Sequence, residues 1–228
     1  MVPGDVLDDT GQKKAGNYTY TRDGKIMAAR LGILRENGNF LNIIPLNGVY
    51  NPAAGDQVVG IVMQVGPSNW LIDINAPYPA PMHASETPWD VDFGETAEFL
   101  RAGDVVLCKV LFVDESRHVQ VTMKDSNLRK LTGGQLVEVP PSKVARVIGK
   151  GGSMIETVKK FTDVWMFVGQ NGRIWINGEP AMIQAATDAI RLIEREAHKG
   201  GLTAKVEAFL AKVAGGPKSK ESMEAEAQ

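Results

Sequence analysis

The most constraining feature of the sequence is a short glycine-rich loop between two predicted helices. It reads Val147-Ile148-Gly149-Lys150-Gly151-Gly152-Ser153-Met154-Ile155. Glycine at both ends of a four-residue loop permits positive φ and lets another backbone approach closely, because glycine has no Cβ. The second helix is predicted to start at Ser153, so its free amide N–H groups and the positive end of its dipole point toward the loop. Such a loop is suited to holding a phosphate group.

The segments around this loop predict an α+β domain over residues 130–198. Its predicted elements are, in order, a strand (135–139), a short helix (142–148), a helix that begins at Ser153, two strands (164–168 and 173–176) and a long helix (180–197). Ser153 and Glu156 are expected to form a capping box at the start of the second helix. The two strands are joined by a turn at 170–172, which contains Asn171-Gly172.

The loop, taken together with this βααββα order, resembles a type I KH domain. That resemblance implies that the loop clamps about four nucleotides of single-stranded RNA. Ile148 and Ile155 would then form an apolar floor under the bases, and Lys150 would add a cation at the loop. The predicted RNA-binding residues of this domain are Lys143, Arg146, Ile148, Gly149, Lys150, Gly151, Gly152, Ile155 and Lys159.

The charge distribution supports a local nucleic-acid contact rather than a general one. The net charge of the chain is −2, so the whole molecule has no bulk attraction for nucleic acid. Residues 143–160 carry five Lys or Arg residues against Glu156 alone, which indicates a local phosphate-binding surface. Residues 53–129 carry five Lys or Arg residues against eleven Asp or Glu residues, which is unusual for an RNA-binding domain.

Residues 54–126 predict a small β-barrel, because five short strands with turns between them fit an OB fold. The runs Gly55-Asp56, Gly60-Ile61-Val62, Trp70-Leu71-Ile72-Asp73-Ile74 and Gly103-Asp104-Val105-Val106-Leu107-Cys108-Lys109-Val110 resemble the ribosomal-protein-S1 type of this fold. The resemblance implies that Trp70, His83, Lys109 and Arg117 face the RNA. Strand alternation is equally compatible with a core position for Trp70, and His83 also fits an ordinary surface histidine.

The two ends of the chain are predicted to lie outside the barrel and the KH domain. Residues 1–52 form a small β domain with hairpin turns at Asp23-Gly24 and Asn37-Gly38. This block is too short to bury a large core, so we expect it to pack against another protein. Residues 199–214 predict one further amphipathic helix, and residues 215–228 predict a disordered tail because they are small, charged and polar.

The sequence offers no catalytic or metal-binding pattern. Cys108 lies in a strand-like apolar run with no histidine or acid beside it, which favours a buried, inert thiol in a reducing compartment. The three histidines and one cysteine lack metal-ligand spacing, so neither a metal nor a cofactor is expected. Asp90, Asp92 and Glu95 are interpreted as a solvated turn, and no nucleophile–base pair is found. The prediction is a protein that is not an enzyme.

Targeting signals are also not found. No window approaches the roughly 20 apolar residues that a membrane span needs. The first residues have neither the basic start nor the apolar core of a signal peptide. The expected location is the cytoplasm.

The order of the three domains is similar to that of the archaeal exosome RNA-binding component, the family of ribosomal-RNA-processing protein four. Further points of similarity are Pro3-Gly4-Asp5 and Gln170-Asn171-Gly172-Arg173-Ile174-Trp175-Ile176-Asn177-Gly178. This resemblance implies a non-catalytic cap of three copies on a hexameric ring of RNase-PH-like subunits. It also implies that residues 1–52 dock on the ring and that the cap guides single-stranded RNA into the central pore.

Two other families share these modules. A transcription elongation or termination factor of the Nus type places an S1-type barrel before KH domains, but it has two KH units of another topology. Polynucleotide phosphorylase also has both modules, but in the reverse order and after large catalytic domains. The single βααββα unit and the length of this chain favour the exosome component over both.

Overall fold

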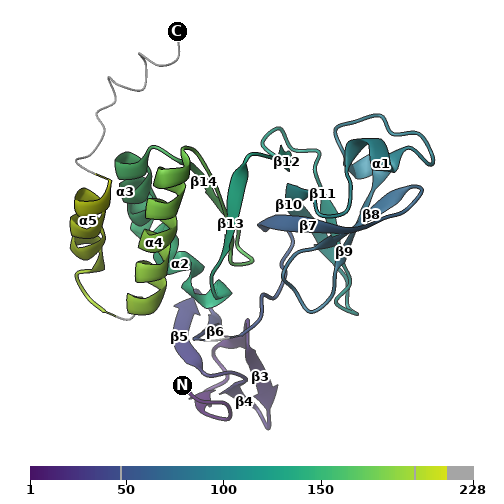
Figure 1. Cartoon of the computed structure of the whole chain (residues 1–228). Coiled ribbons are helices and arrows are strands. Elements are labelled where there is room, and N and C mark those ends of the chain that lie inside the picture. Colours follow the sequence, from purple (N-terminus) through teal and green to yellow (C-terminus); the bar gives the residue numbers. More distant parts are fainter. Residues whose placement is uncertain (47, 198, 215–228) are drawn as a thin grey trace. The chain divides into compact units, whose positions relative to one another are not determined.

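The computed structural model describes residues 1–46, 48–197 and 199–214 (Figure 1). Contacts divide the chain into two compact units. One is formed mainly by the N-terminal residues up to 48, and the other contains both the barrel and the α+β domain. The predicted tail over residues 215–228 lies outside the described residues.

The N-terminal unit is built from two three-stranded sheets. The first has the order β1 (Val6–Asp8), β4 (Lys25–Ala28), β3 (Thr19–Arg22), and the second has the order β2 (Lys14–Ala15), β6 (Phe40–Pro45), β5 (Gly32–Asn37). The hairpin predicted at Asp23-Gly24 is confirmed, because both residues have positive φ and they join β3 to β4. Leu41 and Ile43 are almost completely buried and anchor the small core of this unit.

The middle of the chain folds into the predicted antiparallel barrel. Its strands are β7 (Gln57–Val65), β8 (Asn69–Asp73), β9 (Ala80–His83), β10 (Val105–Val113) and β11 (Val119–Thr122). They follow the order β11-β10-β7-β8-β9, with β12 (Lys130–Leu131) added beside β10. Strands β11 and β9 also lie next to each other, so the barrel is nearly closed and OB-like. The loop between β9 and β10 contains η1 (Ala84–Glu86) and α1 (Thr96–Phe99).

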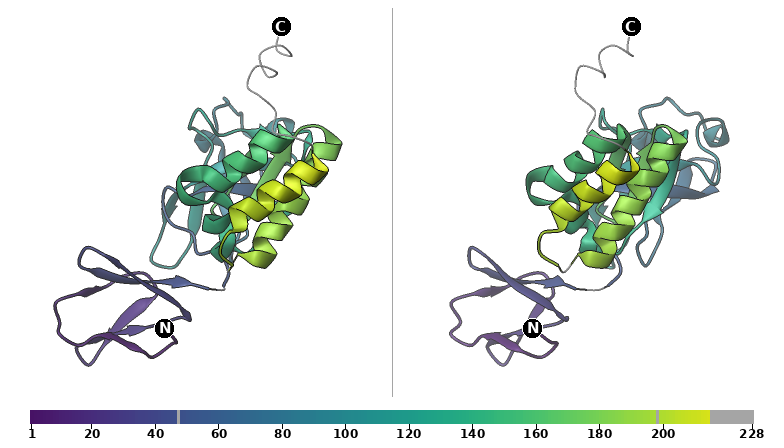
Figure 2. Two further views of the ribbon diagram at one scale, coloured as in Figure 1. Left: turned by 90° about the vertical axis from the view of Figure 1, so that its left-hand side faces the viewer. Right: turned by 60° about the vertical axis from the view of Figure 1, so that its left-hand side comes forward.

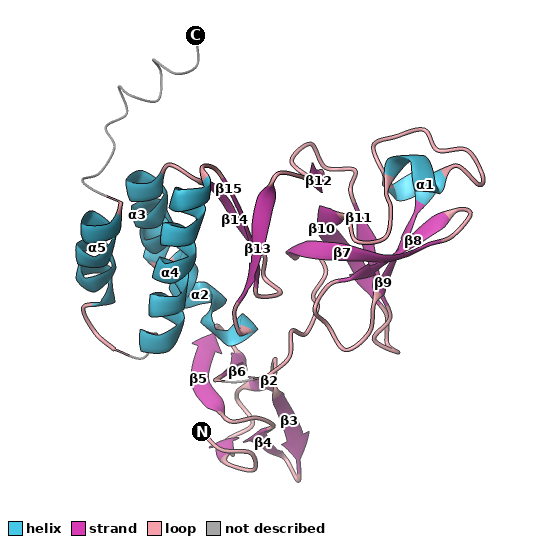
Figure 3. Ribbon diagram, in the orientation of Figure 1, coloured by secondary structure: helices cyan, strands magenta, loops and turns pink. Residues whose placement is uncertain are grey.

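The predicted βααββα order is confirmed in the C-terminal domain (Figure 3). Its elements are β13 (Gly134–Glu138), α2 (Val144–Ile148), α3 (Ser153–Thr162), β14 (Trp165–Val168), β15 (Arg173–Asn177) and α4 (Pro180–Glu196), with η2 (Pro141–Lys143) and η3 (Lys150–Gly152) on either side of α2. The helix predicted over 142–148 is therefore shorter than expected. The additional helix α5 (Leu202–Val213) packs against α3 and α4, and Figure 2 looks onto this helical layer.

The sheet of this domain, with the order β13-β15-β14, is covered on both faces. Alternate residues such as Met166, Ile174 and Ile176 belong to the apolar core on the helical side. On the opposite face, Phe167 and Trp175 pack into the core of the barrel. The barrel and the C-terminal domain therefore share apolar packing along one face of the sheet.

Candidate nucleic-acid interface

The glycine loop has the conformation that its sequence predicts. Helix α2 ends at Ile148, Gly149 follows with φ 76° and ψ 174°, and Gly152 adopts the left-handed conformation directly before α3. No side chain caps the start of α3, so its first amide N–H groups remain available to an anion. The predicted capping box is wrong. Helix α3 begins with Gly152 as its N-cap, which makes Ser153 the first helical residue rather than the cap.

The three glycines of the loop serve different purposes. A Cβ on Gly149 would lie 2.7 Å from both the Cβ and the amide nitrogen of Met154, so glycine is required here by the fold itself. Gly152 has φ 87°, and a Cβ there would have ordinary contact with the Glu156 carboxylate at 3.7 Å. Gly151 has φ 63° with nothing near its Cβ position. The middle of the loop is therefore open to a ligand, whereas Gly149 is fixed by packing.

The predicted cations around the loop are not equivalent. The side chain of Lys150 is exposed and forms no ion pair within the described part of the chain. Lys143 donates a hydrogen bond from Nζ to the carbonyl oxygen of Glu194 at 3.0 Å. Arg146 donates from Nη2 to the carbonyl oxygen of Lys199 at 2.8 Å. Lys143 and Arg146 thus each use one donor to bind a carbonyl oxygen at or after the end of α4, and both keep their positive charge.

The remaining predicted residues of this domain flank the loop. Ile148 and Ile155 are half-buried and pack against the helix-side core, with part of each side chain still at the surface. Lys159 lies in the last turn of α3, at the opposite end of this helix from the loop. The structure therefore brings Ile148, Lys150 and Ile155 together at the loop, and it places Lys159 about one helix length away.

The prediction that Trp70 stacks on RNA is wrong. Its side chain has no exposed surface, and its indole Nε1 donates a hydrogen bond to the carbonyl oxygen of Leu100 at 3.2 Å. Trp70 is paired with Met82 across β8 and β9, and both side chains point into the barrel. A base cannot reach the ring without unfolding the barrel, so Trp70 is a core residue.

The other barrel residues are at the surface but already have partners. His83 Nδ1 accepts a hydrogen bond from the Ser85 amide at 3.1 Å and contacts the Ser85 hydroxyl at 2.8 Å, which caps η1. Lys109 forms an ion pair with Asp125 at 2.9 Å. Arg117, in the β10–β11 turn, donates from Nη1 to Asn51 Oδ1 at 2.7 Å. Lys109 and Arg117 are thus each engaged by another side chain, in a barrel segment that has more acidic than basic residues. RNA binding by this set stays a prediction.

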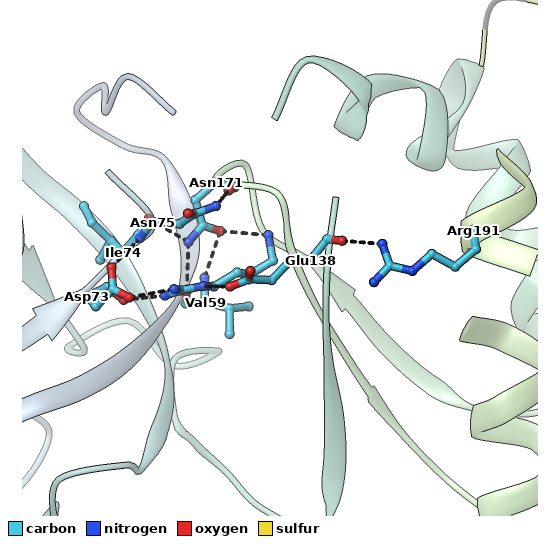
Figure 4. Close-up of polar contacts among 8 residues, drawn as sticks. Val59, Asp73, Ile74, Asn75, Glu138, Asn171 and Arg191 are labelled. Carbon is cyan, nitrogen blue, oxygen red and sulfur yellow. Dashed lines mark hydrogen bonds and ion pairs between the residues drawn. The ribbon is translucent and has the colours of Figure 1, made fainter. Parts of the chain in front are cut away.

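A network of buried polar contacts, which we term the polar lock, joins the barrel to the C-terminal domain and is not predicted by the sequence (Figure 4). The side chain of Asn171 is completely buried. Its Nδ2 donates to the carbonyl oxygens of Val59 at 2.8 Å and Ile74 at 2.9 Å, and its Oδ1 accepts from the Val59 amide at 3.4 Å. Asn75 Nδ2 in turn donates to the carbonyl oxygen of Asn171 at 2.8 Å.

Arg173 forms the second half of this lock. Its side chain is only 6% exposed. The guanidinium donates to the carboxylate of Asp73 on the barrel at 2.6 Å and to Glu138 on β13 at 2.8 Å. Arg191 of α4 donates to the carbonyl oxygen of Glu138 at 2.7 Å, which extends the connection to the helical layer. Separating the two domains would part Arg173 from Asp73 and leave a buried charge without its partner, which is costly. The polar lock therefore favours a fixed arrangement of the barrel and the C-terminal domain.

Other potential chemistry is limited in the described residues. Burial raises the pKa of the Cys108 thiol to about 12, so little nucleophilic thiolate forms at neutral pH. Across residues 1–46, 48–197 and 199–214, no group of three or more His, Cys, Asp or Glu side chains could hold a metal ion. In the same part of the chain, no helix combines the length and the apolar character needed to cross a membrane.

Comparison with known proteins finds similarity to the KH domain family and to exosome complex components. The KH domain family matches residues 134–182. The exosome complex component Rrp4 of Thermoplasma acidophilum is 42% identical over 215 residues, which covers 94% of this chain and 91% of that protein. The Methanosarcina mazei protein of the same name is 46% identical over 210 residues, which covers 92% and 80%.

A solved structure supports the same relationship. A crystal structure assigned as an exosome complex RNA-binding protein superposes with a TM-score of 0.67 at 34% identity. The match covers 72% of this chain and 97% of that one. Similarity of this extent includes the barrel or the N-terminal unit in addition to the KH domain, because the KH domain alone is shorter than the matched length.

Proposed function

The chain belongs to the Rrp4 family of exosome complex components, and from this membership we propose that it is a non-catalytic RNA-binding subunit of an exosome. In this proposal, three copies form a cap on a hexameric ring of RNase-PH-like subunits and guide the 3′ end of single-stranded RNA into the pore. The observation that carries the proposal is the open, uncapped loop 149–152 within a chain related to Rrp4 proteins over more than 90% of its length. The alternative, a transcription factor of the Nus type, is not favoured by these relatives.

The direct experiment is purification of the protein from its native cell. We expect RNase-PH-like subunits to co-purify with it and single-stranded RNA to crosslink to the complex. Recovery of the chain with RNA polymerase subunits and without such a ring would contradict the proposal and favour the transcription factor.

An apolar face in the N-terminal unit supports a docking role for this unit. Leu31, Ile33, Ile44 and Leu46 are between 42% and 59% exposed. Ile33 is paired with Ile44 across β5 and β6, and the Leu46 amide donates to the carbonyl oxygen of Leu31 at 3.2 Å. Because alternate residues of a strand share one face, the four side chains form one patch. Exposed apolar patches of this kind are typical of protein–protein contacts.

Introducing Ile33→Glu and Ile44→Glu together is expected to weaken association with the ring by at least tenfold. Two charges would have to be desolvated in an apolar contact, which costs several kcal/mol. RNA binding by the isolated chain should stay unchanged, because the KH domain is untouched. Co-sedimentation with purified ring subunits measures the first effect, and fluorescence anisotropy measures the second.

The control for this pair is Val6→Glu with Tyr20→Glu. Both residues are exposed, and they flank Met27 in the other sheet, β1-β4-β3. The same two charges there should leave ring binding intact. If only the control pair lost ring binding, the docking surface would lie on the β1-β4-β3 sheet instead.

The isolated chain is expected to release no nucleoside diphosphates from RNA and inorganic phosphate. The Cys108 thiol is buried, and the Nδ1 atoms of His83 and His118 are engaged by Ser85 and Asp114. Chromatography of the products over a long incubation checks this expectation. Phosphate-dependent release of diphosphates by the chain alone would show that it is an enzyme.

A further inference from the structure

Trp165 is the most exposed tryptophan of the described chain and lies at the start of β14. Its side chain retains 38% of its accessible surface, whereas Trp70 retains 0% and Trp175 6%. Strand β14 pairs only with β15 in the described part of the chain, so Trp165 stands at an open edge of the sheet. A large aromatic ring at such an edge is available to a ligand.

Arg129 covers the ring of Trp165. Its guanidinium carbon lies 4.8 Å from the ring centroid, within the range of a cation–π contact. The side chain of Arg129 is exposed, and among the described residues its guanidinium has no hydrogen bond or ion pair. The pair therefore combines a π-surface with a cation that has no anionic partner. Both groups stack on nucleobases, and the guanidinium also pairs with phosphate.

A purely structural explanation is that the pair closes the seam between the barrel and the KH domain. Phe167 and Trp175, which share the same face of the sheet, do close this seam, because they pack into the barrel core. Trp165 is not part of this cluster. Phe167 and Trp175 fill the interface between the barrel and the KH domain without Trp165. The described contacts therefore give the exposed ring of Trp165 no role in packing.

We propose that Trp165 and Arg129 form a second RNA contact that stacks one nucleobase of a strand held at loop 149–152. This inference rests on the proposed RNA binding by the KH domain. Helix α3 runs from the loop to Thr162, and its last turn carries Lys159 and Lys160 shortly before β14 begins. The loop clamps about four nucleotides, so the stacked base is one that lies outside this clamp.

The test compares RNA oligonucleotides of four and eight nucleotides. Trp165→Ala should lower the affinity for the eight-nucleotide RNA by about tenfold, as expected for loss of one stacked base. It should leave the affinity for the four-nucleotide RNA unchanged. Trp165→Phe should retain most of the affinity and should abolish the RNA-induced change in tryptophan fluorescence. Thermal unfolding of each variant checks that the fold is kept.

The control is Tyr78→Ala, which removes another exposed aromatic side chain that lies in the barrel loop between β8 and β9. This variant should bind both oligonucleotides like the native chain. Equal losses in the Trp165 and Tyr78 variants, or an unchanged affinity of Trp165→Ala for the longer RNA, would overturn the stacking site. The proposed RNA binding by the KH domain is judged separately, because it fails if the native chain does not bind the four-nucleotide RNA.

Discussion

Replacing Lys150 and Gly151 by aspartate is expected to weaken the binding of single-stranded RNA by at least tenfold at moderate salt. The substitution removes one cation and adds two carboxylates at the loop where we propose that the phosphodiester lies. Both positions are exposed. A Cβ on Gly151 would meet nothing within 4 Å, and its φ of 63° is one that aspartate tolerates better than most residues. The fold should therefore survive, because Gly149 and Gly152 remain.

The salt dependence separates loss of a phosphate contact from a general loss of affinity. A single strand releases roughly 0.7 counterions per neutralised phosphate, so the slope of log affinity against log salt should become shallower by about this amount for Lys150. Fluorescence anisotropy titrations at several salt concentrations measure both quantities. Unchanged affinity and slope in the folded variant would contradict phosphate binding at the loop and would leave the barrel residues Lys109 and Arg117 as the next candidates.

The chain offers a closely matched control in the N-terminal hairpin. Gly24 also has positive φ, with nothing near its Cβ position, and it is followed by the exposed Lys25. Gly24→Asp with Lys25→Asp therefore introduces the same residues and the same change of net charge. If this control lost as much affinity as the loop variant, the effect would come from net charge rather than from the loop.

Most of the fold was predictable because local signals and global structure agree. Asp23-Gly24 supplies the positive φ values that a tight hairpin needs, and the structure has its turn there. The spacing of Ile183, Ile190 and Ile193 indicates one buried helical face, and all three residues of α4 are in the core. Periodicity and turn residues determine the local conformation of a segment and its apolar face, and both can be read directly from the sequence.

The errors concern properties that depend on contacts distant in the sequence. Alternation along β8 shows that Trp70 and Leu71 face opposite sides, but it does not show which side is the interior. That choice depends on how β8 pairs with β9, which places Trp70 opposite Met82. Lys143 and Arg146 are predicted to bind RNA, and that stays a prediction. Their bonds to carbonyl oxygens around the end of α4, about 50 residues further along the chain, are not visible in the sequence.

Asn171 is another residue whose role depends on contacts distant in the sequence. Within its own hairpin, Asn171-Gly172 is an ordinary turn signal, and the sequence predicts nothing more for it than a turn. Its buried role exists because β8 pairs with β7 only from Ile61 onward. The backbone of Val59 therefore lacks a strand partner on that side, and the Asn171 side chain bonds to its amide and carbonyl instead. Only the three-dimensional pairing of the barrel reveals this requirement.

Asn171→Ala is accordingly expected to lower the free energy of unfolding by about 3 kcal/mol. The carbonyl oxygens of Val59 and Ile74 would lose their donor in a buried site, and each unsatisfied group costs about 1–3 kcal/mol. For the unit that contains the barrel and the KH domain, this loss corresponds to a fall in melting temperature of roughly 6–12 °C. Calorimetry measures the shift and shows whether the two domains still unfold together.

Two further variants identify the cause of this loss. Gln170→Ala changes the adjacent, exposed side chain and should alter stability by no more than about 0.5 kcal/mol. Asn171→Asp should destabilise more than alanine at neutral pH, because a buried carboxylate would face the two carbonyl oxygens without a donor between them. Native-like stability of both Asn171 variants would mean that the apolar contacts of Phe167 and Trp175 hold the domains together without the lock. The predicted order, with Gln170→Ala mildest and Asn171→Asp most severe, is specific to a buried donor and does not follow from loss of side-chain volume.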